Sequence, residues 1–225
     1  MTLYRTVLLT SCLVLSLCGA AQAQTGAQGS SSGAAGKTVT LKMPALPDPV
    51  GVTLDPKATA LLVLDYVDPI CSAQPKCEGG MLPALTAFMA KAREAGVIVA
   101  YGTREQTMSK WLPPIAPAPG DIKIESTAQD RFFSTNLEQE LKGKNITTIV
   151  MAGWKVNGSV TYTSVGATVR DFTVVVPVDT TAAATDYETV IGFYQILNQS
   201  NGNLTNEPLK PRAATLSHTD LITFK

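Results

Sequence analysis

The sequence predicts an α/β fold, a three-layer sandwich in which helices cover both faces of a mostly parallel sheet. Continuous apolar runs such as TALLVLDYVD (59–68) are typical of strands that are buried on both faces, as strands in parallel sheets are. Segments with helical spacing alternate with these runs along the chain. That alternation requires right-handed crossovers between parallel strands and places helices on both sides of the sheet.

The individual elements follow from local patterns. We expect strands at 59–68, 97–103, 146–153 and 173–179, and helices at 79–96, 134–145, 158–172 and 186–199. The first helix shows the logic, because Leu82, Leu85 and Phe88 recur at helical spacing and Gly96 ends the pattern. The proline-rich segment 111–121 is expected to be a loop, and the alternating tail 214–225 to add an edge strand or pack across the surface.

The first 23 residues are expected to be a signal peptide that is not part of the fold. Arg5 precedes an apolar run, and Ala21-Gln22-Ala23 fits the small-x-small rule for cleavage after Ala23. The chain would then be secreted or periplasmic. A lipoprotein acylated at Cys18 is the less favoured alternative, because Leu17 stands where a small residue is wanted.

Residues 24–37 are rich in Gly, Ser and Ala and predict a flexible linker, followed by one domain at 38–225. No apolar run reaches the roughly 18 residues that a membrane span needs. Lys+Arg and Asp+Glu are both 18, so the net charge is zero and there is no basic stripe for nucleic acid. His218 is the only histidine, so we expect no metal site and no cofactor.

Signal-peptide removal leaves two cysteines, Cys71 and Cys77, in the stretch CSAQPKC. An exported chain permits a disulfide, which is the favoured interpretation. A metal site and a reactive thiol are the alternatives, and a metal would need further ligands.

Several polar residues follow the predicted strands, at the sheet edge where α/β proteins bind ligands. Asp65 ends the first strand, Arg104 follows the second, and a Gly-rich turn leads from Gly153 to Ser159 at the start of a helix. Each has a functional and a structural interpretation. Asp65 acts in chemistry or caps the strand end, Arg104 faces a ligand or is solvated, and Ser159 is a nucleophile or only a helix-start residue.

The order of these motifs resembles the isochorismatase-like hydrolases, the cysteine hydrolase superfamily that includes nicotinamidases. The stretches LLVLDYVD, FFSTNLEQEL and AGWKVNGSVTYT carry the resemblance, which covers residues 58–180. The family's aspartate corresponds to Asp65 and its cysteine to Ser159. The family's lysine would fall near Ser126, and the nearest lysine is Lys123.

The resemblance therefore implies an Asp-Lys-Cys triad in which the aspartate is kept as Asp65, the lysine is displaced or missing, and the cysteine is exchanged for Ser159. A serine hydroxyl needs a strong base beside it, and Lys155 in the turn is one candidate for that role. Lys155 and Asn157 are also candidates for ligand contact, with Arg104.

Two hypotheses follow. In the first, a secreted isochorismatase-like protein with an eroded triad binds a small molecule with little or no hydrolysis. In the second, it is an active hydrolase of a small amide, ester or vinyl ether that uses Asp65 as acid or base, with Ser159 at the nucleophile position. A small molecule is the expected partner in both. A homo-oligomer is compatible with the family, although no surface in the sequence indicates one.

Overall fold

The computed structural model describes residues 40, 42, 45–199 and 201–225. The predicted signal peptide at 1–23, the alternative lipid site at Cys18 and the predicted linker at 24–37 lie outside the described residues and stay predictions.

A central parallel sheet organises the fold, in the strand order β4-β3-β2-β5-β6-β8, with β7 pairing with β5 beyond this path. These strands are β2 (Thr59–Leu64), β3 (Ile98–Arg104), β4 (Ile122–Ser126), β5 (Thr148–Trp154), β6 (Thr173–Pro177), β7 (Thr181–Ala182) and β8 (Ala214–Ser217). A second, two-stranded parallel sheet joins β1 (Val52–Leu54) to β9 (Ile222–Phe224). The predicted α/β class with a mostly parallel sheet is confirmed.

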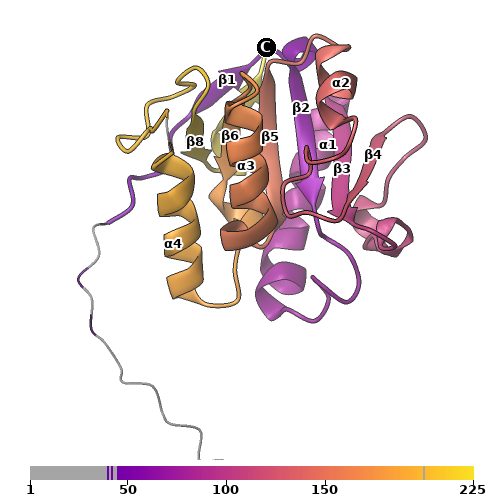
Figure 1. Ribbon diagram of the computed structural model, residues 1–225, viewed down its shortest axis with the longest axis horizontal. Helices are drawn as coiled ribbons and strands as arrows, with labels where there is room; N and C mark the ends of the chain where they lie inside the picture. The colour runs from indigo at the N-terminus through magenta and orange to yellow at the C-terminus, as the bar shows by residue number, and fades with distance from the viewer. Residues whose placement is uncertain (1–39, 41, 43–44, 200) are drawn as a thin grey trace, which may run out of the picture. The chain divides into compact units, whose positions relative to one another are not determined.

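In the described part of the chain, four α-helices cover the sheet: α1 (Leu82–Glu94), α2 (Leu137–Lys142), α3 (Thr161–Thr168) and α4 (Asp186–Leu197). Figure 1 shows α3 and α4 on the near face of the sheet and α1 on the far face. Helical turns Lys76–Met81 and Val156–Val160 lead into α1 and α3. The second turn carries Ser159, so the chain reaches this position before the regular helix begins.

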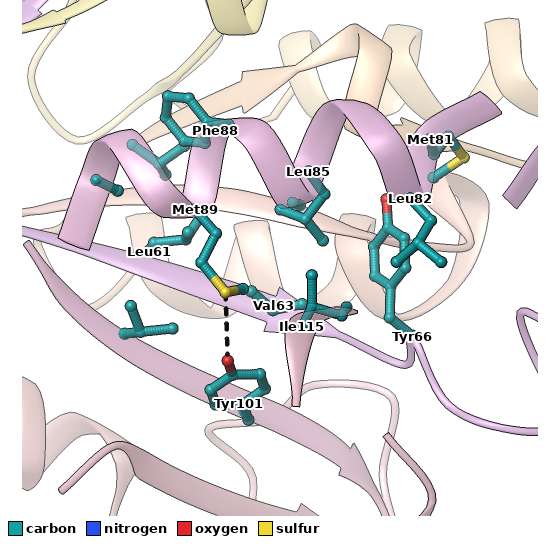
Figure 2. Packing of buried hydrophobic residues seen from close by; sticks show 14 of the residues in the cluster. Leu61, Val63, Tyr66, Met81, Leu82, Leu85, Phe88, Met89, Tyr101 and Ile115 are labelled. Carbon is teal, nitrogen blue, oxygen red and sulfur yellow. Dashed lines mark hydrogen bonds between the residues drawn. The ribbon is translucent and has the colours of Figure 1, made fainter. Parts of the chain in front are cut away.

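The two apolar layers meet the central strand β2 on opposite faces. Leu61 and Val63 belong to the core that includes α1, whereas Leu62 and Leu64 belong to the core under α2, α3 and α4. This alternation follows from the two-residue period of a strand. Figure 2 shows the first core, in which the Tyr101 hydroxyl lies 3.5 Å from the Met89 sulfur. Burial on both faces explains why β2 reads as a continuous apolar run.

The structure adds strands that the sequence did not predict, namely β1, β4 and the two-residue β7, and β4 is the one that extends the edge of the central sheet. After the proline-rich segment, β4 pairs with β3 and forms one edge of the sheet. Its residues alternate between buried and exposed, so the short IKIES stretch lacks a continuous apolar run. At the other edge lies β8, which confirms the expectation that the tail adds an edge strand. None of the described helices has the length and apolar character needed to cross a membrane.

Candidate functional site

Asp65 follows the last residue of β2 and lies at the carboxyl end of the sheet. Its backbone is left-handed, with φ of 57°, a conformation that few residues other than glycine adopt, although aspartate tolerates it better than most. The Asp65 N–H donates to the carbonyl of Gly102 on the neighbouring strand, at 3.2 Å. The residue is buried despite its charge. A buried carboxylate needs a partner, and the fold supplies one.

The partner is Arg131, whose Nη2 donates to both oxygens of Asp65, at 2.9 Å to Oδ1 and 2.7 Å to Oδ2. Thr103 on β3 adds a third hydrogen bond, its hydroxyl lying 3.2 Å from Oδ1. Arg131 is itself almost completely buried. A charge-assisted contact of this kind is stronger than a neutral hydrogen bond and fixes the orientation of the carboxylate.

Arg131 is held from several sides. Its Nη1 donates to the carbonyl of Ala128 at 2.5 Å, and its backbone N–H donates to the hydroxyl of Thr163 on α3 at 3.2 Å. The stem passes over Gly102, where an added Cβ would lie 3.0 Å from the Arg131 Cγ. Glycine on β3 therefore leaves the room that the arginine stem uses. The Nε of Arg131 is buried and has no partner among the described residues.

A cavity of about 430 Å³ opens beside this ion pair, a size that suits a small molecule. Its lining joins residues from four separate stretches of the chain: Asp65, Ile70, Arg104, Thr127, Ala128, Gln129, Arg131, Trp154, Lys155, Gly158 and Ser159. Of the residues predicted for the site, Asp65, Ser159, Arg104 and Lys155 therefore share one cavity.

Ser159 lies in the helical turn that precedes α3. Its hydroxyl donates to the backbone carbonyl of Trp154, at 3.3 Å. The turn packs tightly on the sheet, because an added Cβ on Gly153 would lie 2.7 Å from Val160 and 2.8 Å from Leu64. The glycine at the end of β5 thus allows the turn to bring Ser159 into the same cavity as Asp65.

Lys155 and Asn157 both contact Glu188 on α4. The Lys155 Nζ lies 2.9 Å from the Glu188 Oε1, and the Asn157 amide donates to the same oxygen at 3.4 Å. Glu188 also completes a capping box with Thr185 at the start of α4. The hydrogen bond from Lys155, followed by those from Thr185, lowers the pKa of Glu188 from 4.5 to about 2. Lys155 lines the cavity, whereas Asn157 does not.

Lys123, the nearest lysine to the family position, does not line this cavity. It is exposed on the edge strand β4 and borders two other hollows, of about 410 and 220 Å³. Ser126, at the family position itself, is buried and donates to the carbonyl of Phe133 at 3.2 Å. The cation beside Asp65 comes instead from Arg131, five residues further along the chain.

Arg131 was missed because the motif was counted along the chain to Ser126. One signal was present in the sequence, since DRFF places an arginine directly before Phe132, the buried residue that begins the matched family stretch. A charged residue next to a buried aromatic needs an internal partner or an exit to solvent. Such a residue is a candidate for a buried ion pair.

Cys71 and Cys77 are joined by a disulfide, with their Cα atoms 5.3 Å apart. The bond is compatible with the predicted pairing. It closes the loop that follows Asp65, and Ile70 on this loop lines the cavity. The described part of the chain brings together no group of three or more His, Cys, Asp or Glu that could hold a metal ion.

The family model described as the isochorismatase domain matches residues 59–206, which is well over half of the chain. The chain belongs to the isochorismatase family. The matched segment contains every residue of the cavity, so the family assignment and the site concern the same part of the molecule.

Solved structures of similar fold carry hydrolase names. A cysteine hydrolase from Pseudomonas syringae is 17% identical with a TM-score of 0.61, and the match covers 80% of this chain and 95% of that one. The N-carbamoylsarcosine amidase from Thermoplasma acidophilum is 22% identical with a TM-score of 0.59, over 72% and 96% of the two chains. An isochorismatase family protein from Burkholderia thailandensis is 19% identical with a TM-score of 0.62, over 76% and 96%.

These identities establish a shared fold and carry no substrate to this chain. No curated protein matches the sequence.

Proposed function

We propose that this isochorismatase-family protein binds a small molecule in the Asp65 cavity and hydrolyses it little or not at all. The observation that carries the proposal is the hydrogen bonding of the two residues at triad positions. Both oxygens of Asp65 accept from Arg131, and the hydroxyl of Ser159 donates to the carbonyl of Trp154. The hydroxyl thus has a backbone acceptor where a nucleophile would have a base.

The chemistry of the exchanged residues supports this proposal. A cysteine thiol ionises readily beside a cation or a helix N-terminus, whereas a serine hydroxyl needs a general base within hydrogen-bond reach. Arg131 cannot serve, because a guanidinium does not give up its proton in a protein. Lys155, the other candidate base, is paired with Glu188 at 2.9 Å, and the hydroxyl of Ser159 donates to the carbonyl of Trp154 instead.

The second candidate function is an active hydrolase of a small amide, ester or vinyl ether. The feature that favours it is the gathering of Asp65, Arg131 and Ser159 around one cavity. A vinyl-ether mechanism would require Asp65 to donate a proton, whereas both of its oxygens accept hydrogen bonds from Arg131. This contact makes binding without turnover the stronger proposal.

A substrate screen separates the two functions. Protein that begins at residue 24 is incubated with a panel of small amides, esters and vinyl ethers, beside Asp65→Asn, Ser159→Ala and the control Lys123→Ala. We expect the unsubstituted protein, Lys123→Ala and Asp65→Asn all to form product at the same background rate. Turnover that Lys123→Ala keeps and Asp65→Asn or Ser159→Ala abolishes would contradict the proposal and establish the hydrolase.

Placing the family's thiol at position 159 is a second test of whether the site hydrolyses its ligand. We expect Ser159→Cys to react with iodoacetamide faster than free cysteine, because the cavity holds cationic side chains and the start of a helix. Hydrolysis should stay weak, because triad members act as a unit and Arg131 is committed to Asp65. Amide hydrolysis by Ser159→Cys alone at about 10 per second would show that Arg131 does the work of the missing lysine.

Export is part of the proposal. We propose that the chain is secreted or periplasmic after cleavage behind Ala23. Amino-terminal sequencing of protein from its native compartment should begin at Gln24. A mature chain that begins at an acylated Cys18 would instead establish a lipoprotein.

A further inference from the structure

The cavity carries more positive than negative charge. Arg104, Arg131 and Lys155 line it, against the single carboxylate of Asp65. Two of these cations are already paired, Arg131 with Asp65 at 2.7 Å and Lys155 with Glu188 at 2.9 Å. The remaining charge in the cavity is that of Arg104.

Arg104 is the last residue of β3, the strand beside the one that leads to Asp65. Its side chain makes no ion pair or hydrogen bond with any described residue. The carboxylate of Glu125 on the adjacent strand β4 accepts instead from the backbone N–H groups of Thr107 and Met108, at 3.1 and 2.8 Å. One oxygen of the single glutamate on β4 is therefore engaged by backbone groups.

Two large apolar side chains also line the cavity. Trp154, at the end of β5, is 6% exposed, and half-buried Ile70 directly precedes the disulfide-bonded Cys71. An indole and a branched aliphatic side chain offer a surface for a ring or a short hydrocarbon. The cavity thus places an unpaired guanidinium and an apolar wall around one small volume.

We propose that the ligand of this cavity is a small monocarboxylate with an apolar or aromatic body. Its carboxylate pairs with Arg104, whose planar guanidinium matches two carboxylate oxygens, and its body lies against Trp154 and Ile70. The inference rests on the proposed function, because it names the class of ligand for the same site. A neutral amide of the same shape leaves Arg104, which is exposed, to be solvated by water alone.

Matched pairs of ligands test this inference. Isothermal titration calorimetry compares benzoate with benzamide, and phenylacetate with phenylacetamide, on protein that begins at residue 24. We expect each carboxylate to bind about 10-fold more tightly than its amide, which corresponds to about 1.4 kcal/mol. Arg104→Met keeps an unbranched stem and removes the charge, and it should abolish the preference for the carboxylate.

Lys123→Met is the matched control, because it removes an exposed cation from the neighbouring strand outside the cavity. It should keep the preference for the carboxylate. Equal affinity for the two members of each pair, a preference that survives Arg104→Met, or no binding of any of the four compounds would overturn the inference. Chromatography of the benzamide samples tests the proposed function separately. Conversion of benzamide to benzoate would contradict binding without turnover, and the preference for the carboxylate could still be measured.

Discussion

Two ion pairs border the same cavity and have almost the same length, yet they stand in different surroundings. Arg131 and Asp65 lie 2.7 Å apart, with 2% and 6% of their side chains exposed. Lys155 and Glu188 lie 2.9 Å apart, with 42% and 28% exposed. The first pair joins the segment after β4 to the end of β2, and the second joins the turn before α3 to α4.

The comparison teaches that burial, rather than distance, decides what an ion pair does in this protein. Removing one partner of the buried pair leaves a charge without water or counter-charge, which is costly. The exposed pair is screened by solvent, and each partner regains water when the other is lost. We therefore expect the buried pair to control folding and the shape of the site, and the exposed pair to adjust the position of one lysine.

Arg131→Met should give the largest effect. We expect a loss of about 3–5 kcal/mol in the free energy of unfolding, measured by urea denaturation, because Asp65 would stay buried and unpaired. Lys123→Met, an exposed cation on β4, should stay within about 0.5 kcal/mol of the starting protein.

The double variant Asp65→Asn with Arg131→Met sharpens this prediction. Removing both charges should recover part of the stability that Arg131→Met loses, because no buried charge is left unpaired. Equal stability of Arg131→Met and Lys123→Met would show that the buried pair contributes no more to stability than an exposed cation does.

Breaking the disulfide should have an intermediate effect on the free energy of unfolding. The Cys71–Cys77 bond spans a sequence separation of six residues, and closing so short a loop contributes about 2 kcal/mol through the unfolded chain. Cys71→Ser with Cys77→Ser should lower the free energy of unfolding by that amount. An oxidised protein that takes up two alkylating labels without reductant would show that the bond is absent.

Changes to the exposed Lys155–Glu188 pair should have the smallest effect on stability, and that effect depends on pH. The pKa of Glu188 is lowered to about 2, so its link to Lys155 stabilises the fold at pH above about 4.3, the value in an unfolded chain. That stabilisation is lost as the pH falls through about 2.

Carbon NMR of the Glu188 carboxyl should follow this titration, and Lys155→Met should move it back toward 4.5. Glu188→Gln should lower the urea midpoint only slightly at pH 7, because the pair is screened by solvent. A large loss of stability in that variant would place the exposed pair in the same class as the buried one.

Prediction from sequence succeeded where local pattern and topology decide the outcome. The buried run of β2 and the alternation of strands and helices lead to a parallel sheet, and that sheet brings Asp65, Arg104 and Ser159 to one edge. Prediction failed for β4, whose alternating residues make a short edge strand without a strong apolar signal. It also failed for the cation, because the position inferred for the family's lysine holds Ser126.

The sequence by itself determined the fold class, the family and the residues at the ends of the strands, because each depends on periodicity or on motif order along the chain. Only the tertiary structure decided which cation pairs with Asp65. Arg131 reaches the carboxylate because the segment after β4 folds back beside α3 and Gly102 leaves space for its stem. Burial and pairing are relations between segments far apart in the chain, so no spacing of residues encodes them directly.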